Sequence, residues 1–183
     1  MTGAEPSAPV WRYPVRYEDV SRDGRVLDIA ADPATRAAIA AEADIEALHR
    51  LAATLRLRRW RRDGLAVEGR YEAAMTRICV VSLDPFEVEV SGDFERRYLP
   101  VDPDRAVDNV TVDPEAEDPP DPLPPEGADM AALVLEEFLL GLDPYPRKPG
   151  VAFAPDDAEN AAETGAKDNP FAVLTRLRDK GPE

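Results

Sequence analysis

Five arginines surround a tryptophan between residues 56 and 62, and this run holds the residues best suited to bind a ligand. The arginines are Arg56, Arg58, Arg59, Arg61 and Arg62, and the aromatic residue is Trp60. Alternate residues of a β-strand share a face, so a strand here would place Arg56, Arg58, Trp60 and Arg62 together. Guanidinium groups contact phosphates, and exposed aromatic rings stack on bases. We therefore predict that these four residues bind RNA or another partner.

An alternative for the same run is a solvated strand face that binds no ligand. Its arginines would then pair with acidic side chains on neighbouring strands, for which Glu87, Glu89 and Glu95 are the candidates. The formal net charge of the chain is −15, which disfavours contact with nucleic acid. The sequence leaves both interpretations open.

Residues that could catalyse a reaction or hold a metal ion are sparse. The single histidine, His49, lies beside Leu48 and Leu51 in an expected helix and lacks a partner that would make it a catalytic base. The single cysteine, Cys79, is interpreted as a buried small hydrophobe, and it excludes an internal disulfide. The acidic residues of segment 113–121 do not have the spacing of an EF-hand loop. We expect a protein that is not an enzyme and uses no metal or cofactor.

The arginine run begins a predicted antiparallel meander between residues 55 and 98. Strands are predicted at 55–60, 65–71 and 86–94, and the apolar run 77–83 is also interpreted as a strand. The segment 86–94 alternates apolar and polar residues, which indicates one buried and one solvated face. Asp63-Gly64 predicts a two-residue hairpin turn, and Asp84-Pro85 predicts a second turn.

The remaining elements are predicted from capping signals and periodicity. An edge strand is expected at 11–17, a short partner strand at 26–29, a helix from Asp32-Pro33 to Glu42 and a brief helix at 45–51. Asp129 caps a helix at 130–142, whose apolar stripe is so wide that it must pack against the sheet. The predicted fold class is α+β, an antiparallel β-meander packed against an apolar helix, with a disordered acidic loop and tail.

Charge and proline content divide the chain into unequal parts. Residues 1–100 carry a net charge of −2 and residues 101–183 a net charge of −13. We expect a disordered start (1–9), an α+β core (10–100), an acidic proline-rich loop (101–128), a core-packing helix with a proline-rich segment (129–149), a disordered linker (150–168) and a short amphipathic helix (169–183). In the last of these, the candidate partner-docking residues are Pro170, Phe171, Leu174 and Leu177.

The apolar segments are too short for a membrane helix. The longest of them spans residues 130–142, whereas a spanning helix needs about 20 apolar residues. Residues 1–10 do not have the basic start and apolar stretch of a signal peptide. We therefore expect a cytoplasmic protein without a membrane partner.

Three stretches together resemble a known family. They are Ile78-Cys79-Val80-Val81-Ser82-Leu83-Asp84-Pro85-Phe86, then Leu135-Glu136-Glu137-Phe138-Leu139-Leu140-Gly141-Leu142-Asp143-Pro144-Tyr145-Pro146, and Asn169-Pro170-Phe171-Ala172-Val173-Leu174. With the acidic loop between the first two, the chain resembles the YceD-type family, the large ribosomal RNA subunit accumulation proteins. The resemblance implies a small non-enzymatic bacterial factor in ribosome biogenesis. Many relatives have a Cys-x-x-Cys pair where this chain has Cys79 and Ser82, and a single thiolate cannot hold zinc.

Three hypotheses about function follow from these observations. The first is a factor that binds ribosomal RNA or basic ribosomal proteins of the large subunit, as the resemblance implies. The second is an enzyme whose carboxylates only the fold brings together, which would need a pocket with converging titratable groups. The third is an acidic adaptor that docks a non-ribosomal partner through its C-terminal amphipathic segment. The expected function is the first.

Overall fold

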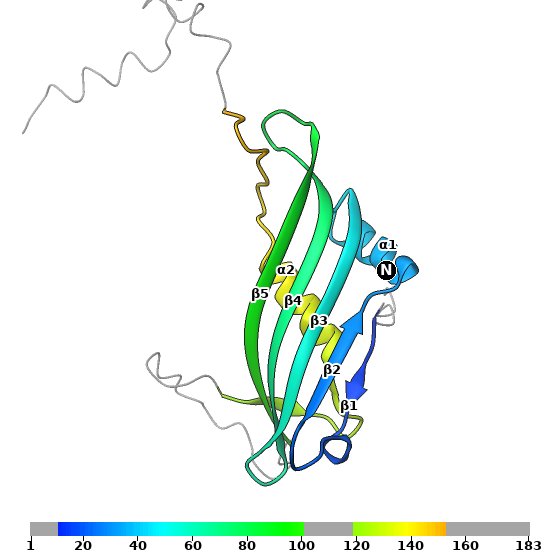
Figure 1. Cartoon of the computed structure of the whole chain (residues 1–183), viewed down its shortest axis with the longest axis vertical. Coiled ribbons are helices and arrows are strands. Elements are labelled where there is room, and N and C mark those ends of the chain that lie inside the picture. The colour runs from blue at the N-terminus through cyan, green and yellow to red at the C-terminus, as the bar shows by residue number, and fades with distance from the viewer. Residues whose placement is uncertain (1–10, 101–118, 153–183) are drawn as a thin grey trace, which may run out of the picture. The chain divides into compact units, whose positions relative to one another are not determined.

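The computed structural model describes residues 11–100 and 119–152, and it confirms the α+β class. The strands are β1 (Pro14–Val15), β2 (Arg25–Ala30), β3 (Ala47–Trp60), β4 (Gly64–Ile78), β5 (Pro85–Pro100), β6 (Asp121–Leu123) and β7 (Ala128–Asp129). The helices are α1 (Pro33–Glu42), α2 (Met130–Leu140) and a 3₁₀ turn at Tyr17–Asp19. Strands β2 to β6 form one sheet in chain order, and β1 pairs with β7 in a separate two-stranded sheet (Figure 1).

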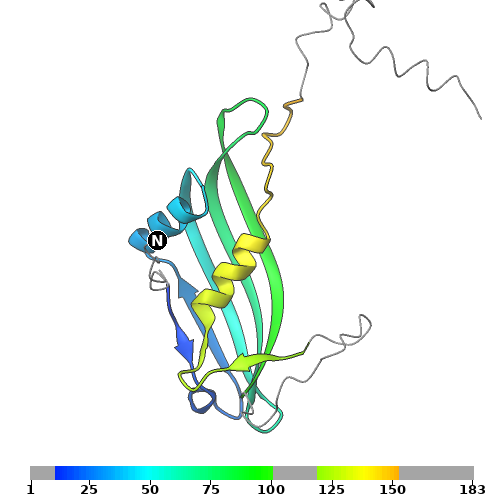
Figure 2. The same ribbon diagram turned by 180° about the vertical axis from the view of Figure 1, so that it is seen from behind.

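Three long antiparallel strands make up the predicted meander. Strand β3 pairs with β4 from Ala47↔Thr76 to Trp60↔Gly64, and β4 pairs with β5 from Leu65↔Tyr98 to Ile78↔Pro85. Buried residues alternate with exposed ones along β3 and β4, as a sheet with one solvated face requires. Helix α2 packs across one face of this sheet, and within residues 11–100 and 119–152 no helix covers the other face (Figures 1 and 2).

Helix α2 attaches to the sheet through its apolar stripe. The Asp129 carboxylate accepts hydrogen bonds from the backbone N–H groups of Ala131 and Ala132, which confirms the predicted N-cap. The helix ends at Leu140, two residues before the predicted end, and Gly141 follows it as the C-cap. Met130, Val134 and Phe138 are completely buried. The apolar stripe therefore lies in the core, as its width indicates.

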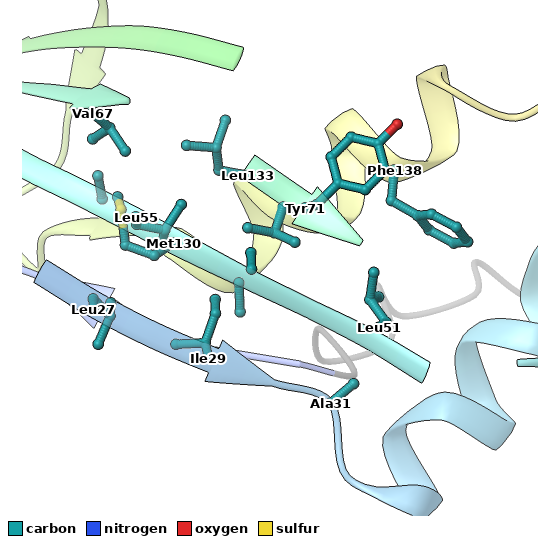
Figure 3. Close-up of a cluster of buried hydrophobic side chains, with 14 of the residues drawn as sticks. Leu27, Ile29, Ala31, Leu51, Leu55, Val67, Tyr71, Met130, Leu133 and Phe138 are labelled. Atoms are coloured by element: carbon teal, nitrogen blue, oxygen red, sulfur yellow. The ribbon is translucent and has the colours of Figure 1, made fainter. Parts of the chain in front are cut away.

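The core lies between α2 and the inward faces of β2, β3 and β4. Leu55 and Val67 are completely buried there, next to Leu133 of the helix (Figure 3). The rings of Tyr71 and Phe138 meet edge to face, with 6.3 Å between their centroids. This contact fixes the position of α2 on β4 and adds to the free energy of apolar burial.

The brief helix predicted at 45–51 is wrong, because β3 begins at Ala47. The strand contains a bulge, in which His49 is the extra residue between the pairs Leu48↔Met75 and Arg50↔Ala74. The bulge turns both Leu48 and Leu51 inward, although they are three residues apart. The spacing that suggested a helix is therefore produced by an irregular strand.

Three other strand predictions are also corrected. Residues 77–83 are not a strand: β4 ends at Ile78, and the next residues form a tight turn in which the N–H of Cys79 donates to the carbonyl of Asp84. Of residues 11–17, only Pro14 and Val15 form a strand, and they pair with β7. Residues 26–29 lie in β2, whose partner is β3, so the two predicted strands do not pair with each other.

The β3–β4 hairpin turn lies where Asp63-Gly64 predicted it, but its geometry differs. The connection has three residues, Arg61 to Asp63, because Gly64 already pairs with Trp60. The residue with positive φ is Arg61, at 52°, rather than either residue of the predicted pair. A β-carbon on Gly64 would lie 2.7 Å from Leu99 Cδ2, so close packing is the reason for glycine here.

The region from residue 101 to 128 contains more structure than a loop. Strand β6 lies within it and pairs in parallel with the last three residues of β5. The rest of the predicted acidic loop, up to residue 118, and the tail residues Pro170, Phe171, Leu174 and Leu177 lie outside the described residues. Within residues 11–100 and 119–152, no helix is long and apolar enough to cross a membrane.

Candidate nucleic-acid and partner interface

The arginine run lies at the end of β3 and in the turn that follows. Leu55 and Leu57 are completely buried beneath the sheet, so Arg56 and Arg58 project from the face that α2 does not cover. Trp60 is the last residue of β3, lies on the same open face and is half-buried. Arg62 belongs to the turn instead of the strand, so its predicted place on the shared face is not confirmed. Three of the four candidate residues therefore share one surface.

The two strand arginines differ in their electrostatic partners. Arg58 donates to Glu68 of β4 at 2.6 Å, whereas Arg56 forms no ion pair within the described part of the chain. Both side chains border the open face, where Arg56, Glu68, Arg70 and Asp93 line a shallow depression of about 650 Å³. The predicted acidic neighbours Glu87, Glu89 and Glu95 are not the partners of these arginines.

The Trp60 ring is covered by guanidinium groups of the protein itself. The Cζ atom of Arg61 lies 4.3 Å from the ring centroid, and that of Arg97 on β5 lies 5.7 Å from it. These cation–π contacts hold the ring in place at the end of the sheet. A base that stacked where Arg61 or Arg97 lies would displace that guanidinium group, whereas phosphate contact by Arg56 would break no ion pair of the described residues.

The remaining arginine of the run has a structural role. Arg59 points toward the buried side of the sheet, where its Nε donates to the carbonyl of Val20 at 2.8 Å. Its Cζ atom lies 4.6 Å from the ring centroid of Tyr17, whose hydroxyl donates to the carbonyl of Arg62. These contacts tie the 3₁₀ turn to the β3–β4 hairpin, so Arg59 is not available for a ligand.

The open face of the sheet is mixed in charge rather than basic. Ion pairs join Arg50 to Glu72 at 2.9 Å and Arg70 to Asp93 at 2.9 Å. Further acidic side chains follow one another along β5 at alternate positions: Glu87, Glu89 and Glu95. Positive charge therefore gathers near the β3–β4 hairpin, and negative charge gathers along β5.

A charged cluster that the sequence did not reveal joins β5 to β6 and α2. The guanidinium of Arg96 donates to Glu137 at 2.5 Å and lies 3.4 Å from Asp121 and 3.5 Å from Glu136. The hydrogen bond with Glu137 raises the pKa of Arg96. Burial raises the pKa of the neighbouring Tyr98 hydroxyl. The partners of Arg96 are 25 to 41 residues away in the chain, so no local pattern could have indicated them.

Cys79 is buried in the turn between β4 and β5, but it does not behave as a plain hydrophobe. Its Sγ accepts hydrogen bonds from the backbone N–H groups of Lys148 at 3.3 Å and Ser82 at 3.4 Å. These donors, Lys148 first, lower the pKa of the thiol to about 6 against the opposing effect of burial. The Cys79 sulfur thus accepts hydrogen bonds that connect the β4–β5 turn to the segment after α2.

The other residues considered for chemistry do not converge on a site. His49 contacts Thr76 at 2.8 Å and Glu87 at 3.3 Å on the exposed surface. Within residues 11–100 and 119–152, no three His, Cys, Asp or Glu side chains are grouped so that they could hold a metal ion. What the described residues offer is a solvated sheet face with a basic end and an acidic edge.

Comparison with known proteins gives one match. The family model described as large ribosomal RNA subunit accumulation protein YceD matches residues 67–178, which is more than half of the chain. The match begins within β4 and includes β5 and α2, so it starts after the arginine run of β3. No curated protein and no solved structure matches the chain.

Proposed function

Because the chain belongs to the YceD family of large ribosomal RNA subunit accumulation proteins, we propose that it is a non-enzymatic binding factor in ribosome biogenesis. It supports the accumulation of large-subunit ribosomal RNA by binding that RNA, basic ribosomal proteins or both. The observation that carries this proposal is the family match over residues 67–178. The surface described above is compatible with it, because solvated charged faces are suited to macromolecular partners.

RNA is contacted at the basic end of the sheet. Arg56 projects there without an ion pair among the described residues, and Arg62 in the neighbouring turn likewise forms none. Binding by phosphate contact releases counterions, with a log–log salt slope of about −0.7 per phosphate for single strands. Two arginines therefore give a slope of about −1.4, which corresponds to weak binding that physiological salt largely suppresses.

The RNA contact is tested by measuring affinity for single-stranded large-subunit RNA fragments at several salt concentrations. Arg56→Ala should reduce the magnitude of the slope by about 0.7. Arg50→Ala is the matched control, because Arg50 lies on the same strand and is exposed but is engaged by Glu72. An equal change in both variants, or no RNA binding at low salt, contradicts the RNA contact.

The cellular role is tested by depleting the protein and measuring the ratio of large-subunit to small-subunit ribosomal RNA. The proposed function predicts that this ratio falls and that the wild-type chain restores it. Sedimentation of the tagged protein with large-subunit precursors at low salt gives a second readout. An unchanged ratio after complete depletion would refute the function.

A further inference from the structure

Strand β5 presents a long edge that no other strand of the described residues pairs with before Tyr98. On one side β5 pairs with β4 along its whole length, whereas on the other β6 covers only Tyr98 to Pro100. Between residues 86 and 96, the described part of the chain supplies no backbone hydrogen bond to the outer side of β5. In Figure 1, β5 forms the margin of the sheet along this stretch. Half of the backbone groups there point outward, and no described residue pairs with them.

The edge is long enough to hold a peptide. Eleven residues at about 3.4 Å each span about 37 Å, whereas strands in globular proteins usually have 5–6 residues. Proteins shorten, cover or charge such edges to avoid pairing with other chains. Here the edge is long, and no strand among the described residues pairs with it before Tyr98, so its side chains decide what can pair with it.

These side chains differ sharply between the two faces of β5. Glu87, Glu89, Asp93 and Glu95 project on the open face. Val88, Val90 and Phe94 project on the opposite face, where they pack partly against the core. A strand paired with β5 would place its own side chains about 5 Å from these residues. It would therefore meet carboxylates on one face and apolar groups on the other.

The carboxylates remain accessible to a new partner. The side chains of Glu87 and Asp93 are 70% and 74% exposed, although His49 and Arg70 contact them. Glu89 has Ala74 opposite it on β4 and forms no ion pair within residues 11–100 and 119–152. A basic side chain arriving from the outer side of β5 could thus pair with Glu89 without breaking an existing contact.

A second copy of the chain is disfavoured at this edge in the register centred on Ser91. An antiparallel pairing of two β5 strands about Ser91 would place Glu89 opposite Asp93 and Glu87 opposite Glu95. Like charges directly opposite each other destabilise a strand pair. The same carboxylates would repel the phosphates of RNA. The edge is therefore complementary to a basic polypeptide and unfavourable for the other two occupants.

We propose that the outer edge of β5, from residue 86 to 96, binds an extended basic peptide segment that adds a strand to the sheet. Lysine or arginine side chains at alternate positions of the segment pair with Glu87, Glu89, Asp93 and Glu95, and the residues between them pack on Val88 and Val90. This inference rests on the proposed function, which identifies the partner as a basic ribosomal protein.

The binding test uses a ten-residue peptide of alternating lysine and valine, with affinity measured by fluorescence anisotropy at low salt. Glu89→Lys should weaken binding about fivefold, since it replaces an attractive cross-strand pair with a repulsive one. Glu42→Lys is the matched control: it makes the same change in net charge at an exposed site on α1 and should leave the affinity unchanged. Equal losses in the two variants would show unspecific attraction and overturn the proposal.

A second peptide tests the strand pairing itself. N-methylation of every residue removes the backbone donors on both edges of the peptide while the lysine charges stay, and it should abolish binding. Equal affinity of the methylated and unmethylated peptides would show that no strand is added.

In depleted cells, Glu89→Lys should restore the ribosomal RNA ratio less well than the control variant. Full restoration by both variants refutes the edge site, whereas a ratio that depletion does not change refutes the proposed function instead.

Discussion

Truncating Phe138 should detach α2 from the sheet more effectively than any other single change in the helix. The side chain is completely buried, and its ring meets that of Tyr71 edge to face. We expect Phe138→Ala to lower the free energy of unfolding by about 4 kcal/mol, the middle of the range for buried phenylalanine. Domains of this kind are stable by about 5–15 kcal/mol, so the loss is a large part of the total.

The measurement is equilibrium unfolding in urea followed by circular dichroism. With a slope of about 2 kcal/mol per molar, Phe138→Ala should lower the midpoint by about 2 M. Leu140→Ala is the control on the same helix, because Leu140 is 72% exposed and its truncation should cost less than about 0.5 kcal/mol. Phe138→Leu, which keeps an apolar side chain, should cost about 1 kcal/mol and provides a milder variant if the alanine variant does not fold.

The reasoning is refuted if the alanine variants at positions 138 and 140 shift the midpoint equally. That result would mean that the buried stripe of α2 does not pack on β4 in solution. A change in the slope together with the midpoint would point instead to altered compactness of the unfolded chain.

Two further predictions concern the charged cluster and the buried thiol. Arg96→Met should lower the unfolding free energy by about 2 kcal/mol. A double-mutant cycle with Glu137→Gln should show a coupling energy of about 1 kcal/mol or more between the two residues. Additive effects of the two substitutions would contradict the ion pair. Because the pKa of Cys79 is lowered to about 6 in the folded protein from 9.0, its contribution to stability is fully present above pH 9 and is lost as the pH falls through 6. In urea titrations, the free energy of unfolding of the wild type relative to Cys79→Ala should therefore rise between pH 6 and 9. A difference in unfolding free energy that does not depend on pH would show that the N–H groups of Lys148 and Ser82 do not hold a thiolate.

The predictions that succeeded from the sequence rest on local signals. The alternation along residues 86–94 identified β5, because period-two burial needs no information from outside the strand. Asp32 and Asp129 marked both helix starts correctly, because a carboxylate cap acts on backbone groups two or three residues ahead.

The predictions that failed depended on contacts between distant segments. The bulge at His49 gave β3 a helix-like apolar spacing, and only the register with β4 reveals it. The run after Ile78 has the composition of a strand, yet hydrogen bonds with the segment after α2, from Lys148 N–H to Cys79 Sγ and from Val80 N–H to the carbonyl of Pro146, favour a turn. In the candidate site, the grouping of Arg56, Arg58 and Trp60 followed from alternation. The contacts of Arg58 with Glu68 on β4 and of Trp60 with Arg97 on β5 could not be read from the run itself.

The pairing of the chain start with the start of α2 has a consequence for synthesis. The N–H of Tyr13 donates to Asp129, and the N–H of Met130 donates to the carbonyl of Tyr13, so the first and last core elements close on each other. Hairpins form within microseconds, but the ribosome adds only about 5–20 residues per second. Phe138 is therefore synthesised roughly 2–8 s after the end of β5. During that interval the nascent meander exposes its whole apolar face, and it is then that the chain depends most on protection from aggregation.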